Sequence, residues 1–397
     1  MINYREAQQI LVARARSFGR ERVGLEQAYG RVLTERIRAD RDYPPFNRST
    51  MDGYAIRYSD WESGIRDFSI TEVIYAGALP AKTIGPGECY KIMTGAAVPQ
   101  GADAVIRKEE VEEDARWIHT GQAVCLPFQN IASRGEDLQS GDTVIQAACL
   151  CDPSVMGLLA SVGKEQVEVE KLPAVSLFTT GNEIVPFDAP ASLLQIRNSN
   201  RWVLESLFAG GGGIRPRSFA HLPDDRRLLH SSLEAALGSD LIVLSGGVSA
   251  GDADFVPGVL EEIGVRKLFH KVAIKPGKPV WCGILPNGGM VFALPGNPFS
   301  CLVTFRLFIQ SYLNACFGLS GPIRFELPLQ AAKIKKTVLD EFFPVRITGD
   351  PAWLDQVPLN GSGDIRLGLR ANALGLHPAA AGGLEAGDRV ICLPYQV

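Results

Sequence analysis

The stretch "GMVFALPGNPFSCLVTFRLFIQSYLNACF", residues 289–317, decides the fold class. It begins with a short, continuous apolar run, which is typical of a strand buried on both faces of a sheet. A sharp Pro-Gly turn follows, and residues 298–317 then show apolar positions at helical spacing. Asn297 stands at the N-cap of that helix and Pro298 in its first turn. The stretch therefore predicts a buried strand, a tight turn and a long helix in succession.

The same alternation extends back to Lys171. Two further continuous apolar runs predict strands: "AVSLFTTG" (174–181) and "DLIVLSGG" (240–247). Three segments between and after these runs have helical periodicity: "SNRWVLESLFAG" (199–210), "DDRRLLHSSLEAAL" (224–237) and "DFVPGVLEEIG" (254–264). Apolar strands that alternate with helices indicate a mostly parallel sheet covered on both faces. We therefore expect a multidomain α/β protein with a doubly wound sheet.

Three other regions have a different pattern of apolar and polar residues. Residues 1–40 predict two amphipathic helices, "EAQQILVARA" (6–15) and "LEQAYGRVLTERI" (25–37), and another helix is expected at about 154–162. Between these helical regions, short apolar runs broken by Gly and Pro indicate a β-rich insert, and the chain becomes β-like again from Gly321. We therefore predict four domains, with these ranges: 1–40 with 140–170, 41–139, 171–318 and 319–397.

Composition excludes several classes of protein. The 397 residues carry a formal net charge of −4, which argues against general nucleic-acid binding. The N-terminus has charges where a signal peptide needs an apolar core, and no run reaches the roughly 18 apolar residues of a membrane span. We therefore expect a cytoplasmic protein without membrane or nucleic-acid partners. The eight scattered cysteines are expected to be buried, reduced thiols.

In a doubly wound sheet, ligands bind beyond the carboxyl ends of the strands. Three predicted loops lie there, at residues 179–183, 245–254 and 295–298. In the middle loop, Gly246 and Gly247 let backbone N–H groups approach a ligand closely. Asp252 could equally be a helix cap, whereas Asp254 is favoured as a functional carboxylate because it shares the loop with the glycines.

A cationic turn follows in the segment "KVAIKPGKP". It places Lys271, Lys275 and Lys278 within eight residues, and Pro276 and Pro279 fix φ around the last two lysines. A solvated charge run is the ordinary alternative, but such runs rarely come with a locked backbone. Two lysines held beside a glycine turn favour a compact oxyanion, and molybdate, sulfate and phosphate all fit its charge.

Two turns in the insert leave their role open. "PPFNRSTMDGYAIR" contains Asp52, and "KIMTGAAVPQGADAVI" contains Thr94; each is either a simple hairpin turn or part of a site. The chain has neither the phosphate-binding GxxxxGK[ST] loop nor a dinucleotide GxGxxG after a strand. No histidine pairs with a plausible serine or cysteine nucleophile. The chemistry predicted is metal-assisted work on a phosphate or another oxyanion.

With these segments in view, the chain resembles the molybdopterin molybdenumtransferase (MoeA) family, which is related to the E domain of gephyrin. The resemblance covers essentially the whole chain. Each matching segment alone is a weak signal, but together, in family order, they are highly specific. They are "PPFNRSTMDGYA", "IMTGAAVPQGADAV", "SRGED", "TTGNE", "LSGGVSAGDADF", "KVAIKPGKP" and "LPGNP".

The resemblance implies a helical linker domain, an inserted β lid, a molybdopterin-binding domain and a C-terminal β-barrel-like domain. It implies a homodimer whose site lies between domains and across chains. The implied reaction inserts molybdate into adenylylated molybdopterin and releases AMP, with assistance from Mg²⁺. Contacts could extend to the upstream adenylyltransferase and to downstream molybdoenzymes.

Family roles can be carried onto matching residues of this chain. Lys275 and Lys278 would hold molybdate, with Lys271 nearby and with Arg346 and Ser362 from the terminal domain. The substrate would also meet the two strand-end turns, through Ser245, Gly246, Gly247, Pro295, Gly296 and Asn297. The implied catalytic residues are Asp52, Thr94, Glu183, Asp254 and Lys275, of which Asp52, Glu183 and Asp254 would bind the metal. Asp224 matches another acidic position of the family.

Three other functions stay open. The first is a molybdopterin adenylyltransferase, although that group typically has a GGTG-type loop where this chain has residues 246–249, Gly-Gly-Val-Ser. The second is a non-catalytic molybdopterin-binding scaffold, against which Asp52, Asp254 and Lys275 argue. The third is a paralogue that inserts tungstate, and no sequence argument separates two oxyanions of nearly the same size and charge.

Overall fold

The computed structural model describes residues 1–248, 255–335 and 337–395. The chain divides into two compact units. The main unit comprises Met1–Glu35, Ala148–Pro153 and Gln166–Val397, and the insert unit comprises Arg36–Ala147 and Ser154–Glu165. The two predicted carboxylates of the 245–254 loop, Asp252 and Asp254, lie outside the described residues.

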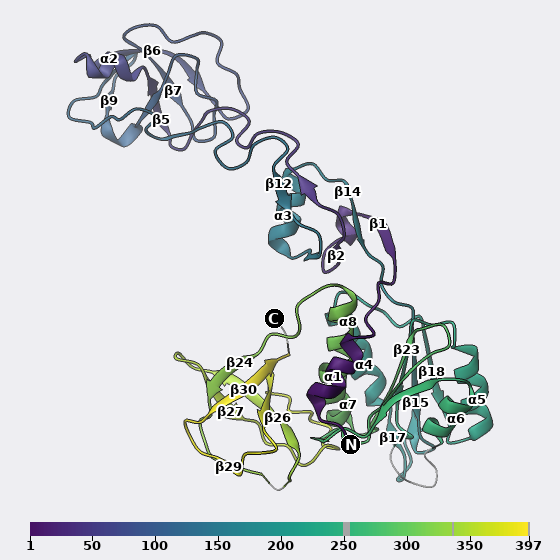
Figure 1. Ribbon diagram of the computed structural model, residues 1–397. Coiled ribbons are helices and arrows are strands. Elements are labelled where there is room, and N and C mark those ends of the chain that lie inside the picture. Colours follow the sequence, from purple (N-terminus) through teal and green to yellow (C-terminus); the bar gives the residue numbers. More distant parts are fainter. Residues whose placement is uncertain (249–254, 336, 396–397) are drawn as a thin grey trace. The chain divides into compact units, whose positions relative to one another are not determined.

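A six-stranded sheet with helices on both sides forms one part of the main unit (Figure 1). Its order is β18 (Ser218–Leu222), β15 (Val175–Thr180), β19 (Leu241–Ser245), β23 (Met290–Leu294), β22 (Trp281–Ile284) and β20 (Arg266–His270). The first four strands are parallel neighbours, and the last two are antiparallel additions at one edge. The prediction of a mostly parallel sheet is confirmed, although β18, β20 and β22 were not among the predicted strands.

Helices cover both faces of this sheet, as the apolar strands require. One face is covered by α1 (Tyr4–Val12), α4 (Ser199–Gly210) and a long helical stretch. This stretch consists of α7 (Pro298–Thr304), a π-helical turn (Phe305–Ile309) and α8 (Gln310–Cys316). On the other face pack α5 (Arg226–Ala235) and α6 (Val256–Glu262). Alternate strand residues divide between the two cores: Leu177 and Val243 face α4, whereas Phe178 and Ile242 face α5 and α6. The predicted helices of this region are thereby confirmed.

The N-terminal segment differs from its prediction. A helix was expected over residues 25–37, but only a 3₁₀ turn forms at Leu25–Gln27. Beyond Gly30, which has φ 74°, the chain is extended, and β2 (Val32–Leu33) joins a four-stranded sheet. There β2 pairs with β14 (Gln166–Glu170) and β13 (Cys149–Leu150), and β1 (Arg20–Gly24) pairs with β14. The helical spacing was misleading because pairing with distant strands offers the same backbone groups a different set of hydrogen bonds.

The C-terminal part of the main unit is a second sheet, in the order β21-β26-β28-β30-β24, with β27 also paired to β26. The strand bounds are Ile274–Lys275 (β21), Phe325–Pro328 (β24), Asp340–Thr348 (β26), Trp353–Gln356 (β27), Ala373–His377 (β28) and Arg389–Pro394 (β30). The β character expected after Gly321 is confirmed. The first strand, β21, carries Lys275, so this sheet positions part of the lysine turn.

The insert unit is β-rich, as predicted. Its six-stranded sheet has the order β8 (Ala104–Arg107), β5 (Gly53–Ile56), β7 (Glu88–Ile92), β6 (Asp67–Ile74), β10 (Trp117–His119) and β9 (Glu112–Glu113). Two apolar clusters, which include Tyr54, Phe68, Tyr90 and Ile92, fill its interior. Helix α3 (Pro153–Ser161) forms where a helix was expected.

The cysteines and the helices agree with two further expectations. All eight cysteines are free thiols; seven are buried and Cys149 is half-buried. Burial raises the pKa of the Cys301 thiol to about 12, so this side chain behaves as a small apolar group. Among the described residues, no helix combines the length and the apolar character that a membrane crossing needs.

Candidate functional site

Three strand ends meet at one edge of the central sheet. The parallel register aligns Thr179 of β15 with Ser245 of β19, and Ser245 with Leu294 of β23. The loops that follow these strands are therefore neighbours: the N–H of Gly246 donates to Leu294 O at 3.0 Å, and Ser245 Oγ donates to Pro295 O at 3.4 Å. The structure thus brings together the predicted residues Ser245, Gly246, Gly247, Pro295, Gly296 and Asn297.

The glycine turn at this edge cannot accept larger residues without rearrangement. Gly246 has φ 106° and Gly247 has φ 65°, a conformation that side chains rarely adopt. A methyl group on Gly246 would lie 2.6 Å from Thr180 Oγ1, and one on Gly247 would lie 2.8 Å from Val256 Cγ2. Close packing against Thr180 and Val256 therefore requires glycine at both positions.

Asn297 links this edge to the C-terminal part of the chain. It occupies the N-cap position of α7, as predicted, but its side chain makes no capping hydrogen bond. Instead its Nδ2 donates to Ser362 Oγ at 2.9 Å, and the N–H of Phe299 donates to Ser362 O at 3.1 Å. The structure therefore places the predicted residue Ser362 against the Pro295–Asn297 turn.

The lysine turn spans residues 271–280. Its ends are closed by backbone hydrogen bonds from Lys271 to Val280 and from Val272 to Lys278, each 3.0 Å. Gly277 has φ 103° and packs so tightly on α7 that a methyl group there would lie 2.6 Å from Thr304 Cγ2. Lys275 and Lys278 are exposed, whereas Lys271 is half-buried.

None of these three lysines has an ion-pair partner within the part of the chain that the structure describes. The sheet register pairs Lys275 with Glu341, the nearest acidic residue along β26. That carboxylate is already engaged, because Glu341 Oε1 lies 2.9 Å from Lys333 Nζ and both side chains are mostly buried. Among the described residues, the positive charge of the lysine turn therefore has no acidic partner.

Arg346 is not brought to the lysine turn. It follows Glu341 by five residues on β26, a separation of roughly 16 Å along a strand. An odd offset also places it on the opposite face of the sheet, where it is exposed and in register with Asp355 of β27. Its assignment to the oxyanion stays a prediction, since this arrangement offers no direct contact with Lys275.

Acidic residues also lie at the strand-end edge. The N–H of Asn182 donates to Asp224 Oδ2 at 3.2 Å, and the N–H of Asp224 donates to Asn182 Oδ1 at 3.1 Å. This reciprocal pair ties the loops after β15 and β18 together. Glu183 is exposed and folds over Gly181, where a methyl group would lie 2.7 Å from Glu183 Oε2.

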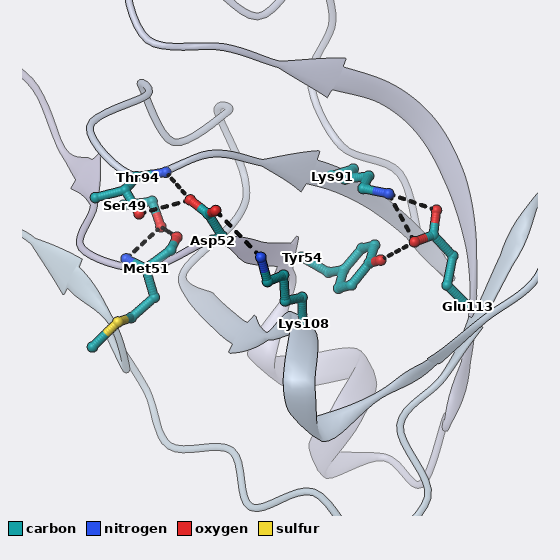
Figure 2. A network of polar contacts seen from close by, with 8 residues as sticks. All are labelled: Ser49, Met51, Asp52, Tyr54, Lys91, Thr94, Lys108 and Glu113. Carbon is teal, nitrogen blue, oxygen red and sulfur yellow. Dashed lines mark hydrogen bonds and ion pairs between the residues drawn. The ribbon is translucent and has the colours of Figure 1, made fainter.

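In the insert unit, Asp52 and Thr94 are direct partners (Figure 2). Asp52 Oδ1 accepts the N–H of Thr94 at 2.8 Å and its hydroxyl at 2.7 Å. Lys108 Nζ lies 3.7 Å from Oδ2. The hydrogen bond from the Thr94 N–H, which has the larger effect, and the one from its hydroxyl hold the pKa of Asp52 below its usual value. Lys108 was missed by sequence reasoning because it belongs to the charge run "RKEEVEE", which reads as a solvated surface.

A second polar network, formed by Tyr54, Lys91 and Glu113, lies beside the first in Figure 2. The hydroxyl of Tyr54 donates to Glu113 Oε2 at 2.6 Å, and Lys91 Nζ reaches both carboxylate oxygens at 2.7 and 2.8 Å. Burial, with the hydrogen bond to Glu113, raises the pKa of Tyr54. Every polar group in it has a partner, so we interpret it as structural support for β5.

The predicted metal ligands are divided among different parts of the chain. Asp52 belongs to the insert unit, Glu183 belongs to the main unit, and Asp254 lies outside the described residues. Over residues 1–248, 255–335 and 337–395, no group of three or more His, Cys, Asp or Glu side chains is arranged to hold a metal ion. The metal set therefore stays a prediction.

Comparison with known proteins gives a match along almost the whole chain. The model of the MoeA N-terminal region (domain I and II) matches residues 2–163, and the model of a probable molybdopterin binding domain matches residues 176–315. A molybdopterin molybdenumtransferase of Synechocystis sp. is 31% identical over 362 residues, covering 88% of this chain and 92% of the relative. One of Synechococcus elongatus is 34% identical over 386 residues, covering 93% of each chain.

Solved structures agree with these matches. A molybdopterin biosynthesis MoeA protein from Pyrococcus horikoshii OT3 is 29% identical, with a TM-score of 0.83, and the alignment covers 99% of this chain and 100% of that one. Another structure of a molybdopterin biosynthesis MoeA protein from Pyrococcus is 30% identical, with a TM-score of 0.80 and full coverage of both chains. The multidomain fold is therefore shared over its whole length.

Proposed function

We propose that this chain, which belongs to the MoeA family of molybdopterin molybdenumtransferases, inserts molybdate into adenylylated molybdopterin and releases AMP. The observation that carries this proposal is the lysine turn, whose cations have no acidic partner in the described chain. The turn lies in the same compact unit as a glycine edge at which strand ends meet. One compact unit would thus carry both a site for an oxyanion and a site for an organic ligand.

The lysine turn would bind molybdate through Lys275 and Lys278, with Lys271 nearby. An oxyanion of charge −2 is attracted by uncompensated ammonium groups, and the attraction grows as water is excluded. The ion pair of Lys333 with Glu341 supports this role, because it prevents Glu341 from neutralising Lys275. The hydrogen bonds that close the turn fix the backbone from which the lysines extend.

The strand-end edge would bind the pterin and its phosphates. Parallel sheets bind ligands outside the carboxyl ends of their strands. Gly246, Gly247 and Gly296 present backbone without side chains there, and the contact of Asn297 with Ser362 holds the third loop in place. These residues would orient the reacting bond, which is the main contribution of a site without a covalent nucleophile.

Mg²⁺ is the expected metal, and the donor set fits its preference for oxygen ligands. Asp52, Glu183 and Asp254 would hold it. Asp52 is suited to this role because Thr94 fixes Oδ1, whereas Oδ2 has Lys108 Nζ 3.7 Å away. Glu183 is exposed. When bound, the ion would supply charge neutralisation at the pyrophosphate.

A homodimer is proposed on the basis of an apolar surface in the main unit. A shallow groove there is lined by Trp202, Val203, Ser206, Leu207, Leu302 and Leu367. Elsewhere in the same unit, large apolar side chains are strongly exposed, with 99% for Leu193, 84% for Leu194 and 88% for Leu369. Such a surface favours burial by a partner, and a second copy would supply it symmetrically. Cytoplasmic localisation and contact with neighbouring enzymes of the same biosynthesis stay predictions.

The decisive experiment measures AMP. Purified full-length protein is incubated with adenylylated molybdopterin in four buffers, with or without molybdate and with or without Mg²⁺. We expect fast AMP release only with both ions, because cleavage before the oxyanion arrives would waste the activated pterin. Asp254→Ala should abolish release while leaving molybdate binding intact, and Lys267→Ala serves as the control because that lysine is exposed and paired with Glu261.

Other outcomes would favour the alternatives. ATP-dependent formation of the adenylylated compound would indicate an adenylyltransferase, and binding without turnover would indicate a scaffold. Preference for tungstate over molybdate at equal concentration would identify the paralogue. Fast AMP release in buffer free of molybdate, or a trapped adenylyl-enzyme adduct, would refute the proposed coupling.

A further inference from the structure

Two neighbouring pairs of polar residues at the strand-end edge differ in a way that points to ligand contact. In the first pair, Asn198 Nδ2 donates to Thr179 Oγ1 at 2.7 Å. Thr179 Oγ1 also lies 3.1 Å from His221 Nδ1, and Asn198 Oδ1 accepts the N–H of Arg201 at 3.2 Å. This pair is therefore satisfied within the protein, and its role is to connect β15 with the start of α4.

The second pair, Thr180 and Asn200, is not satisfied. Thr180 is 6% exposed, and its Oγ1 has neither solvent contact nor a hydrogen-bond partner within the described chain. Asn200 uses both amide protons, on Ser245 Oγ at 2.8 Å and on Gly296 O at 2.6 Å, but its buried Oδ1 accepts nothing there. Buried polar atoms without partners are rare in native proteins, so each requires an explanation.

The orientation of the Asn200 amide is chemically determined. Gly296 O can only accept a hydrogen bond, so the atom that faces it at 2.6 Å must be the nitrogen. Turning the amide over would bring two acceptor oxygens together. The unpartnered atom is therefore the oxygen, and its complement is an N–H or O–H donor.

Both unpartnered atoms adjoin the glycine turn. A methyl group on Gly246 would lie 2.6 Å from Thr180 Oγ1, and one on Gly247 would lie 3.1 Å from it. Asn200 donates hydrogen bonds to Ser245, which precedes the turn, and to Gly296. Gly296 is itself close to the turn, because a methyl group there would lie 3.6 Å from the Cα of Gly246. Thr180 lies on the face of β15 that α5 and α6 cover, whereas Asn200 is part of α4, which covers the other face. The two atoms therefore flank the turn from opposite faces of the sheet.

We propose that Thr180 and Asn200 are ligand-binding residues of this edge, with Asn200 Oδ1 accepting an N–H of the pterin and Thr180 Oγ1 hydrogen-bonding a polar atom of the same substrate. The inference rests on the proposed function. A pterin carries ring and amino N–H groups, which provide the donor that Asn200 lacks. Because solvent does not reach either oxygen in this conformation, ligand contact requires the turn at Gly246 and Gly247 to shift.

The test separates ligand contact from structural support. Thr180→Val replaces the hydroxyl with a methyl group of similar size, and Thr179→Val is the matched control one residue away. Each full-length variant is assayed for thermal unfolding without ligand and for its dissociation constant with adenylylated molybdopterin. Thr180→Val should bind about tenfold more weakly, the order expected for one lost hydrogen bond, without a fall in Tm. Thr179→Val should lower Tm and change the dissociation constant less than about twofold.

Two more variants complete the design. Thr180→Ser retains the hydroxyl and should restore binding. Asn200→Ala and Asn198→Ala should both lower Tm, but only Asn200→Ala should also weaken binding. Undiminished affinity in Thr180→Val, or a loss of Tm equal to that of Thr179→Val, would overturn the inference while leaving the proposed function standing. Failure of the unaltered protein to bind the compound would overturn the proposed function and the inference with it.

Discussion

The turn that carries Asp52 in the insert unit and the lysine turn of the main unit hold their charged side chains in opposite ways. Asp52 is held by two hydrogen bonds from Thr94, which fix one carboxylate oxygen and lower the pKa of the group. The lysine turn fixes its backbone instead and leaves Lys275 and Lys278 without acidic partners in the described chain. A carboxylate that is to hold a small metal ion benefits from a fixed orientation. Lysines that are to hold an oxyanion benefit from retaining their charge.

The pairing of Glu341 shows how the lysine turn is protected from its own neighbours. Lys333 engages Glu341 at 2.9 Å and also lies 4.5 Å from the centre of the Phe343 ring. The carboxylate that stands beside Lys275 in the sheet is therefore occupied before any ligand arrives. The two turns can be compared experimentally, beginning with the question of whether they act together.

The largest effect is expected from removing each charge in a separate variant and then combining the two variants in mixed dimers. Asp52→Ala and Lys275→Ala should each reduce AMP release about a hundredfold or more, the order of effect for a group that stabilises charge at the reacting centre. If one chain supplies Asp52 and the other supplies Lys275, co-refolding equal amounts should restore about a quarter of the unaltered activity, because half of the dimers are mixed and each has one intact site.

The controls for this experiment are direct. Chromatography with differently tagged chains verifies that mixed dimers have formed. Mixing each variant with itself should restore nothing. Verified mixed dimers without activity would place both residues in a site built from one chain.

A smaller effect concerns the lysine turn alone. Lys275→Ala should weaken molybdate binding at least about tenfold, since loss of a charge partner at a partly desolvated site reduces affinity by this order. The fold should stay intact because Lys275 is exposed. Isothermal calorimetry with molybdate measures the change, and Lys267→Ala, an exposed and already paired lysine, is the control. An unchanged molybdate affinity in Lys275→Ala would remove this residue from the site.

The smallest effect concerns the Asp52 turn alone. Thr94→Val removes the hydroxyl donor but keeps the N–H, so the pKa of Asp52 should rise toward the ordinary value of 3.8 without reaching it. Because the folded-state pKa is depressed, the stabilisation from ionised Asp52 is present above the unfolded pKa. It is lost as pH falls through the folded pKa, and Thr94→Val moves that loss to higher pH.

NMR titration of labelled aspartate measures this shift. Ser49→Ala is the control, because the Ser49 hydroxyl donates to Met51 O at 2.6 Å rather than to Asp52. A titration of Asp52 that is the same in Thr94→Val and in the unaltered protein would show that the hydroxyl does not tune the carboxylate.

The sequence by itself determined three of the six strands of the central sheet, the helices that follow them, and the turns at the strand ends. Continuous apolar runs predicted β15, β19 and β23, and helical spacing predicted the helices that follow them, because these patterns depend on neighbours along the chain. Glycines at the strand ends and prolines around the lysines marked the turns for the same local reason.

Only the tertiary structure decided which distant residues meet. The helix predicted over residues 25–37 is replaced by strand because its backbone pairs with strands more than 100 residues away. Asn297 gives its side chain to Ser362 rather than to its own helix, and Glu341 is set beside Lys275 by the β21–β26 register. The difference between Thr179 and Thr180 likewise has no local signal, because two adjacent threonines gain or lose partners according to what folds against each face of the strand.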